Sequence, residues 1–510
     1  MNIKESIKKN YQCIIMFALL AIYYGYRLFH ITPWYDETYT YINFINEGFW
    51  YSATHWPAPN NHIFFSMLSS LINWCGVYIG LRGISYLAAM GTVILLYKLF
   101  REFTSKTVSI ITVLSYTLFL LTNRLAVQGR GYSLGTFFLM LAVYFGYRIA
   151  FKDEVKKKDY ILWAIALWLG LYTVVTSVYW VVGLCLSCGI VLLVLKKYKT
   201  LVKLIVSSLV AAGLTTISYA IMWFSIGAQR ISSDITTGYY GTDVWFLIKE
   251  FPRTCLMRGI EIMTTDRSVQ GVDRETFFRD FKFFARGILS EVFGITSMWF
   301  FYGLVVLVVV SLILFVICVV RKKNKYIYLL ALSSIGYLGM FVTLWIQSAY
   351  PFVRVFSYIG IFLIIPIGML YAVIAEHFAK LIKWKHIGLV LCVLATVFTG
   401  AKLTSDAYVR EYDYVDYYAL DAIEHVEWDE VGTFMVSDYY IEQQVQFQKI
   451  IGDKCELQVD TDSPDVILTK KQLSGYWPDY IINEDLERCY VQEREVLYEN
   501  HCNNAYFCTC

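Results

Sequence analysis

The sequence predicts an all-helical polytopic membrane bundle with a small α/β domain at its carboxyl end. Hydrophobic residues make up 57% of the 510 residues and charged residues only 17%. Mean hydropathy is +0.50, and these values together are far from those of soluble domains. The apolar residues fall into about eleven segments that approach the ~20 residues needed to cross a bilayer. A last stretch of the chain is acidic instead.

The expected membrane spans are separated by short charged loops. The fifth is short for a span, and its boundary with the sixth is the hardest to draw. The segments cover residues 11–30, 82–101, 107–123, 132–151, 160–174, 176–195, 204–226, 296–320, 326–348, 353–377 and 386–402.

The charges of the short loops predict the orientation, because cytoplasmic loops keep an excess of Lys and Arg. Lys4, Lys8 and Lys9 place the amino terminus inside. Counting spans from there puts every basic loop on the inner side. An odd number of spans then places the carboxyl-terminal stretch outside. No A-x-A-like cleavage site follows the first span, so we expect an uncleaved anchor.

Two domains are expected, a membrane domain over 1–402 and an extracytoplasmic α/β domain over 403–510. The second contains 23 Asp and Glu against 7 Lys and Arg, although the whole chain has a net charge of +3. The bases elsewhere sit in inner loops and form no basic aqueous face, so no nucleic-acid partner is expected. Helices are expected at 414–426 and 440–450, and strands at 431–436, 457–459 and 466–468.

Cysteines are concentrated in the predicted outer domain, where disulfides are permitted. Their pairing stays open, because the odd number leaves one thiol over unless Cys75 or Cys255 joins it. They are Cys455, Cys489, Cys502, Cys508 and Cys510.

Two long segments, 31–81 and 227–295, are expected on the outer face and exceed simple connectors in length. Each contains a stretch with one apolar helical face, at 63–74 and at 277–292. We expect both helices to lie at the membrane interface and the first to roof the bundle. In the second, the apolar stripe is expected to consist of Phe277, Phe278, Phe281, Phe284, Ile288 and Val292.

Two adjacent acids, Asp36 and Glu37, stand in the first outer segment, within the run Pro33-Trp34-Tyr35-Asp36-Glu37-Thr38. A carboxylate next to aromatic rings and the membrane surface is partly desolvated, so Asp36 is a candidate general base. Glu37 points elsewhere and is expected to position the acceptor or a loop. Alternatively, Asp36 caps a helix that begins at Glu37, which need not exclude catalysis.

Arg130 and Arg354 both fall at the predicted outer ends of spans. Guanidinium groups bind phosphate oxygens bidentately and stabilise a phosphate leaving group. Alternatively, both are interface anchors that snorkel. Arg82 could hold a loop by hydrogen bonds, and His62 could be a satisfied interfacial histidine. Because His, Asp and Glu form no convincing metal cluster, no cofactor is expected, although the residues leave a divalent metal open.

Several of these motifs occur together in a known family. The outer Asp-Glu pair, Pro59-Asn60-Asn61-His62 and Leu81-Arg82-Gly83-Ile84-Ser85 follow one another as in the polytopic glycosyltransferases of the GT-C superfamily. The resemblance is strongest to the protein O-mannosyltransferase and aminoarabinose transferase branch. Similar segments follow at Gln128-Gly129-Arg130-Gly131-Tyr132, Leu171-Tyr172-Thr173 and Tyr350-Pro351-Phe352-Val353-Arg354. Relatives often carry an acidic residue just before the arginine, where this chain has Gln128-Gly129.

The resemblance implies a transferase in the plasma membrane, and it would be inverting if Asp36 acts through the acceptor in a single displacement. It would move a sugar from a polyprenyl-phosphate carrier to a hydroxyl or amine of an acceptor that stays open. It further implies that membrane lipid and the lipid-linked donor are the partners. The implied residues are Asp36 and Glu37 for catalysis, Arg130 and Arg354 for the donor phosphate, and Tyr35, His62, Arg82 and Tyr132 for the substrate pocket.

Two other functions stay open. A transporter or flippase for a lipid-linked substrate would share the spans and basic loops. Transporters place charges near the membrane midplane, and the span centres here are nearly free of charge. A non-catalytic envelope-assembly protein could display the acidic domain, but it would leave the Asp-Glu segment without a purpose.

Overall fold

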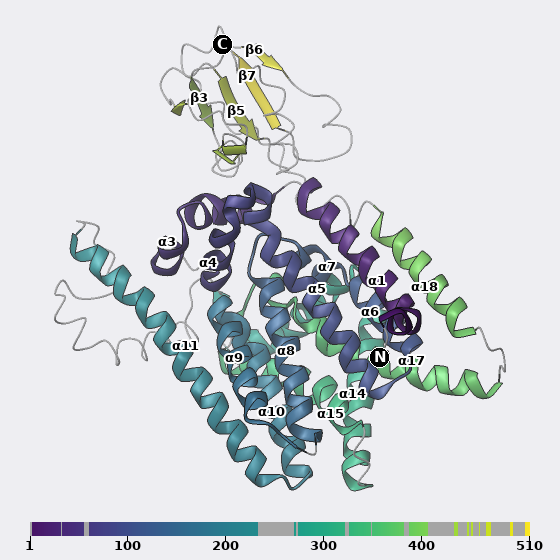
Figure 1. Cartoon of the computed structure of the whole chain (residues 1–510). Coiled ribbons are helices and arrows are strands. Elements are labelled where there is room, and N and C mark those ends of the chain that lie inside the picture. The colour runs from purple at the N-terminus through teal and green to yellow at the C-terminus, as the bar shows by residue number, and fades with distance from the viewer. Residues whose placement is uncertain are drawn as a thin grey trace.

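The computed structural model shows a bundle of long helices with a small sheet beyond one end (Figure 1). The numbering of the elements follows that figure. The structure describes residues 3–31, 33–55, 61–152, 154–232, 270–271, 274–321, 326–347, 349–381, 387–405, 408, 433–436, 446–447, 450–451, 458–459, 466–470, 490–492 and 505–509.

The helices of the bundle follow the predicted order of apolar segments. The first half of the chain gives α1 (Ile3–His30), α5 (Val77–Phe103), α6 (Lys106–Thr117), α7 (Leu120–Ala126), α8 (Tyr132–Phe151), α9 (Lys157–Thr173), η3 (Val175–Ser177), α10 (Val178–Val194) and α11 (Tyr198–Ser232). The second half gives α14 (Met298–Val320), α15 (Ile327–Ala331), η4 (Leu332–Gly336), α16 (Tyr337–Gln347), α17 (Ile359–Leu381) and α18 (Ile387–Leu403).

The number of spans differs from the predicted eleven. Within the described residues, eight helices are long and apolar enough to cross a membrane, or nine if a bent pair counts as one span. The bent pair is α6 with α7, which meet at 80° where one span was expected at 107–123. The segments expected at 160–174 and 386–402 form α9 and α18, each only 17 residues long. A multi-pass membrane protein is supported, and the count of eleven is not confirmed.

The bend between α6 and α7 has a polar cause. Asn123 on α7 donates its amide to the carbonyl oxygen of Thr117 over 2.7 Å. Its side-chain and backbone oxygens both accept from Arg27 Nη1 of α1, at 2.5 and 2.6 Å. Arg27 is fully buried, so turning α7 toward α1 satisfies a guanidinium that a straight span would leave in an apolar interior.

The core of the bundle relies on close helix contacts. A Cβ atom at Gly183 of α10 would lie 2.3 Å from the backbone oxygen of Gly336, so only glycine lets these two backbones touch. Trp163 and Trp180 are fully buried between neighbouring helices. A Cβ at Gly170 would lie 2.5 Å from the Trp180 ring. Such small-residue contacts are typical of membrane helix packing.

The first outer segment folds into short helices above the bundle. They are α2 (Tyr35–Thr40), η1 (Tyr41–Ile45), α3 (Phe49–Thr54), α4 (Ile63–Ile72) and η2 (Asn73–Cys75). The helix expected at 63–74 is confirmed by α4 and η2. Ser66 and Ser69 of α4 are fully buried while Leu71 is 53% exposed. The serine side of α4 therefore faces the protein, and part of its apolar side faces outward.

The second outer segment is described over 227–232, at the end of α11, and from residue 270 onward except 272–273. The stretch 233–269 lies outside the described residues. From residue 270, β1 (Gln270–Gly271) pairs antiparallel with β2 (Ala349–Tyr350), followed by α13 (Arg274–Phe293) and, further on, η5 (Val353–Phe356). Phe277, Ile288 and Val292 of α13 are buried as predicted, but Phe278 is 59% exposed. Including Phe278 in the stripe was wrong, because adjacent helical residues point about 100° apart.

The carboxyl-terminal stretch contributes a mixed five-stranded sheet. Its order is β4-β3-β5-β7-β6, with β3 parallel to β4 and β5, and β7 antiparallel to β5 and β6. The strands are β3 (Thr433–Val436), β4 (Gln458–Val459), β5 (Val466–Lys470), β6 (Tyr490–Gln492) and β7 (Ala505–Thr509). The first three match the expected strands. The helix expected at 414–426, most of that at 440–450 and the cysteine pairing fall outside the described residues, so the α/β domain and its boundary stay predictions.

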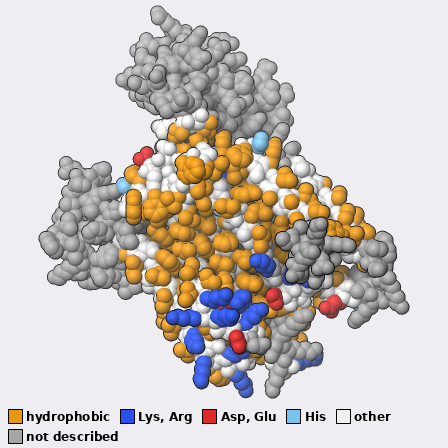
Figure 2. Space-filling model, in the orientation of Figure 1, with side chains coloured by type: hydrophobic (Ala, Val, Ile, Leu, Met, Phe, Trp, Pro, Cys, Tyr) orange, Lys and Arg blue, Asp and Glu red, His pale blue; other side chains and the backbone are white. Residues whose placement is uncertain are grey.

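The two ends of the bundle differ in character. On the face shown, Lys and Arg side chains gather at the end opposite α3 and α4, with a broad hydrophobic band between (Figure 2). This distribution agrees with the predicted orientation, which stays a prediction.

At the other end, Phe447 is fully buried and its ring lies 5.5 Å from that of Tyr41, next to the short helix α2.

Candidate active site

The two adjacent acids lie in the first turn of α2, which begins at Tyr35. Trp34 is the residue before the helix, in an extended conformation. Its backbone N–H donates to Glu37 Oε2 over 2.9 Å, so Glu37 caps the helix. The interpretation of Asp36 as the cap of a helix beginning at Glu37 is therefore wrong. Successive helical residues point about 100° apart, which sends the two carboxylates to different surroundings.

Glu37 is surrounded by hydrogen-bond donors. Arg82 of α5 binds it bidentately, with Nε 2.8 Å from Oε1 and Nη2 2.9 Å from Oε2. The backbone N–H groups of Trp34 and Gly129 add bonds of 2.9 and 2.6 Å. Glu37 is 0% exposed and Arg82 1% exposed. This carboxylate thus accepts four bonds, and it joins α2, α5 and the turn before α8.

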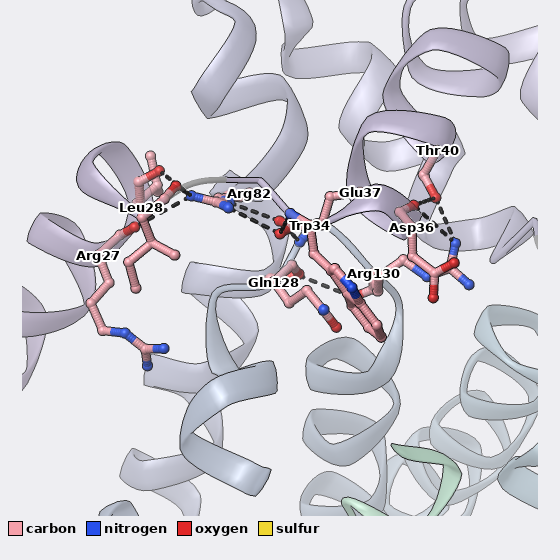
Figure 3. A network of polar contacts seen from close by, with 12 residues as sticks. Arg27, Leu28, Trp34, Asp36, Glu37, Thr40, Arg82, Gln128 and Arg130 are labelled. Carbon is pink, nitrogen blue, oxygen red and sulfur yellow. Dashed lines mark hydrogen bonds and ion pairs between the residues drawn. The ribbon is translucent and has the colours of Figure 1, made fainter. Parts of the chain in front are cut away.

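Arg82 also closes the end of α1. Its Nη1 donates to the backbone oxygens of Leu28 and Ile31, at 3.2 and 2.7 Å. The last carbonyl groups of a helix lack partners within the helix, and a cation there also complements the helix dipole. Figure 3 shows Arg82 between Leu28 on one side and Glu37 on the other. Arg82 holds a loop by hydrogen bonds, which was one of the two interpretations open from the sequence.

Asp36 has far fewer partners. Arg354 Nη1 lies 3.2 Å from Asp36 Oδ2, with side-chain exposures of 27% and 8%. This oxygen is buried, and it accepts no hydrogen bond from the described part of the chain. The contact is therefore an ion pair without an aligned hydrogen bond. The Arg354 guanidinium also lies 5.2 Å from the Trp34 ring centre and 4.8 Å from that of Phe352, in cation–π geometry.

Arg130 contacts α2 at Asp36 and Thr40. Its Nη1 donates to the Asp36 backbone oxygen over 3.2 Å and to Thr40 Oγ1 over 2.7 Å. Thr40 Oγ1 in turn donates to the Asp36 oxygen over 2.7 Å, and Figure 3 shows these three residues together. Arg130 is 2% exposed, so it is buried in the protein and does not snorkel to an interface.

His62 completes the cluster. Its Nδ1 accepts the Gly131 backbone N–H over 2.7 Å, and its Nε2 lies 3.5 Å from Arg130 Nη2. Burial, with added repulsion from Arg130 and Arg354, holds the pKa of His62 well below its ordinary 6.5. The imidazole is therefore neutral, and because Nδ1 is an acceptor, Nε2 carries the proton. Two N–H donors, from His62 and Arg130, consequently face each other.

The two tyrosines predicted for the pocket lie differently. Tyr132 is buried, and its ring meets that of His62 edge to face with centroids 4.8 Å apart. Tyr35 is half-buried, and its ring lies 6.1 Å from that of Tyr39. The structure thus brings Asp36, Arg130, Arg354, His62 and Tyr132 together, while Glu37 and Arg82 form a separate, closed pair. The roles predicted for these residues stay predictions.

Two glycines in the turn before α8 were not recognised as part of the site. A Cβ at Gly129 would lie 2.4 Å from Leu81 Cδ1 and 3.1 Å from Glu37 Oε1. A Cβ at Gly131 would lie 3.0 Å from His62 Cβ. Both glycines let the backbone approach a site residue closely, and the Gly-Arg-Gly run was the signal that could have pointed to this.

No group of three or more His, Cys, Asp or Glu that could hold a metal ion occurs among the described residues. The expectation of no cofactor stays a prediction.

Comparisons with known proteins gave no matching family model and no matching curated protein. Among solved structures, the chain is similar to ArnT from Cupriavidus metallidurans bound to undecaprenyl phosphate. The TM-score is 0.51 at 10% identity, over 98% of each chain. It is also similar to the oligosaccharyltransferase AglB from Archaeoglobus fulgidus in complex with an inhibitory peptide and a dolichol-phosphate, at a TM-score of 0.43 and 11% identity over 91% of this chain and 70% of that one. The likeness to ArnT supports the predicted resemblance at the level of the fold alone.

Proposed function

We propose that this protein is a membrane glycosyltransferase that moves a sugar from a polyprenyl-phosphate carrier to a hydroxyl or amine acceptor, with inversion, at the outer face of the membrane. One observation carries the proposal. A buried carboxylate, Asp36, lies beside three cationic or N–H donor groups, Arg354, Arg130 and His62, and among the described residues its one ion pair is the loose contact with Arg354. A base next to an anion site is what sugar transfer from a lipid phosphate needs.

The anion site is supported by the donors around it. His62 Nε2–H and Arg130 Nη2 lie 3.5 Å apart and cannot bond each other. An oxygen beside the pair, about 2.9 Å from each nitrogen, would accept from both, and phosphate offers several such oxygens. Arg354 adds a second guanidinium, 3.2 Å from Asp36 Oδ2. The fold similarity to a protein crystallised with undecaprenyl phosphate supports a polyprenyl phosphate as this ligand.

The proposed step is a single displacement. The acceptor oxygen or nitrogen forms a bond to the anomeric carbon while the bond from that carbon to the phosphate oxygen breaks. Polyprenyl phosphate leaves with the bonding electrons, and the acceptor proton passes to the Asp36 carboxylate. Arg354, Arg130 and the neutral His62 stabilise the charge that grows on the phosphate.

Glu37 and Arg82 have a supporting role in this scheme. Both carboxylate oxygens of Glu37 are already engaged by Arg82 and by two backbone N–H groups. Glu37 is therefore proposed as a positioning residue that fixes α2 against the turn carrying Arg130. Tyr132 orients His62 through their ring contact.

The test is a transfer assay with purified protein in lipid vesicles. Radiolabelled polyprenyl-phosphate sugars and candidate acceptors are supplied to the wild type and to Asp36→Asn. We expect transfer by the wild type and its near-complete loss in the variant. The matched control is Asp159→Asn, because Asp159 is also buried and paired with an arginine, Arg148, over 2.9 Å, on helices away from this site. Normal transfer by Asp36→Asn rejects the base, and movement of the lipid across the vesicle without transfer indicates a flippase.

A further inference from the structure

Gln128 is a buried side chain that the proposed mechanism does not use. It is 1% exposed, and neither its Nε2 nor its Oε1 has a hydrogen-bond partner among the residues that the structure describes. Burying a carboxamide without hydrogen bonds is unfavourable, and such groups are rare in folded proteins. A residue that keeps this arrangement calls for an explanation.

The backbone of Gln128 fixes where the side chain can go. Its carbonyl oxygen accepts the Arg130 N–H over 2.6 Å and the Ser85 hydroxyl over 2.6 Å. The next residue, Gly129, is bound to Glu37 Oε1. The turn is thus held on both sides. In the view of Figure 3, the carboxamide extends from this turn in the direction of the Trp34 indole.

We propose that the Gln128 carboxamide binds a hydroxyl group of the donor's sugar and contributes to the choice of sugar. This inference rests on the proposed function. A carboxamide offers one acceptor and two donor positions without charge, and a hydroxyl group both donates and accepts. The charged groups nearby, Arg130 and Arg354, suit the phosphate instead. The sugar of a lipid-linked donor is bonded directly to the phosphate. Gln128 is two residues from Arg130, so a phosphate at Arg130 would bring the sugar close to Gln128.

Access to the carboxamide depends on Trp34. The indole is half-buried, and the carboxamide extends toward it. Arg354 lies against this ring. In this proposal, a sugar hydroxyl reaches the carboxamide only if the indole moves relative to Arg354.

The test compares Gln128→Met, which keeps the shape without the amide, with the wild type. For the donor that the wild type uses, we expect the KM to rise about tenfold, as the loss of one hydrogen bond predicts. We expect the melting temperature to stay equal or rise, because an unpartnered buried amide has been removed. Ser69→Ala is the matched control. It removes another buried oxygen, on α4, that has no hydrogen-bond partner in the described part of the chain, and it should leave the KM unchanged.

A series of donors, each lacking one sugar hydroxyl, sharpens the test. One deoxy donor should bind the wild type about tenfold more weakly than the parent donor does. The same deoxy donor and the parent donor should bind Gln128→Met equally well. Gln128→Asn, which withdraws the amide by one methylene, should also raise the KM and serves if the Met variant does not fold. An unchanged KM together with a lower melting temperature overturns the inference and assigns the amide to a buried water. Because the wild type transfers sugar in that outcome, the proposed function would stand.

Discussion

Asp36 and Glu37 are neighbours in the sequence, yet their surroundings are opposite. Glu37 is buried, and its carboxylate accepts bidentate bonds from Arg82 and one bond from each of two backbone N–H groups. Among the described residues, Asp36 has one ion pair, at 3.2 Å, to an arginine that is 27% exposed. A saturated carboxylate has no lone pair left for a substrate proton, whereas a loosely paired one does. This difference is the reason for proposing a structural role for Glu37 and the general base for Asp36.

The difference also extends to the arginines. Arg82 is 1% exposed and occupied by Glu37 and by the end of α1. Arg354 lies at the edge of the site, held by one carboxylate and by aromatic rings. The Arg354 side chain is 27% exposed, so a donor phosphate can reach it, and the phosphate would then replace Asp36 as its counter-charge. Arg82 has no such freedom.

The largest effect is expected from Asp36→Asn. Removing a general base lowers kcat by about 10²- to 10⁴-fold. Since the Asp36 side chain contributes little bonding to the fold, the melting temperature of the variant should stay close to that of the wild type. Single-turnover transfer and thermal unfolding, measured on the same preparation, check both expectations. A large loss of stability with residual activity per folded molecule would reverse the assignment of the two acids.

Glu37→Gln should show the opposite pattern. It leaves the Arg82 guanidinium buried without its counter-charge, and breaking a buried ion pair in this way lowers the free energy of unfolding by about 3–5 kcal/mol. Denaturation of the detergent-solubilised protein measures it. In Glu37→Gln with Arg82→Gln the two losses should not add, because the residues form one pair. Additive losses would show that the two side chains act independently.

Arg354→Gln is expected to have an intermediate effect. Hydrogen bonds to charged groups contribute about 1.5–3 kcal/mol, so the KM for the donor should rise roughly 10- to 100-fold. Stability should fall, because the buried Asp36 carboxylate loses its counter-charge. The loss should be smaller than in Glu37→Gln, because Arg354 is 27% exposed and the pair has no aligned hydrogen bond. Donor titrations of the variant and of Arg279→Gln test this, since Arg279 pairs with Asp280 on the surface of α13. Equal effects of both variants would mean that Arg354 acts only through general surface charge.

Part of this contrast could be predicted from the sequence. Loop charges and span ends placed Asp36, Arg130 and Arg354 on one face, because topology alone decides which ends of helices meet. The pairing of Glu37 with Arg82 and Gly129 could not be predicted, since it depends on how α2 is rotated and on where it begins. A start at Tyr35 and not at Glu37 turns the whole helix. Likewise, the 80° bend of α6 and α7 depends on the contact of Asn123 with Arg27, which lies 96 residues away.

The smallest effect concerns His62, on the Asp36 side. Its pKa in the folded protein lies well below 6.5 because of burial and of Arg130 and Arg354, so below about pH 6.5 the unfolded chain binds more protons than the folded one. The free energy of unfolding should therefore fall as the pH drops below about 6.5, by at most about 1.4 kcal/mol per pH unit. His62→Gln, which keeps an N–H donor, should flatten this slope, whereas His30→Gln, at an exposed position, should retain it. Chemical denaturation at pH 7.5, 6.5 and 5.5 measures the slopes. A slope that survives in His62→Gln would place a charged imidazole in the folded site, and His62 would then have to bind phosphate as a cation.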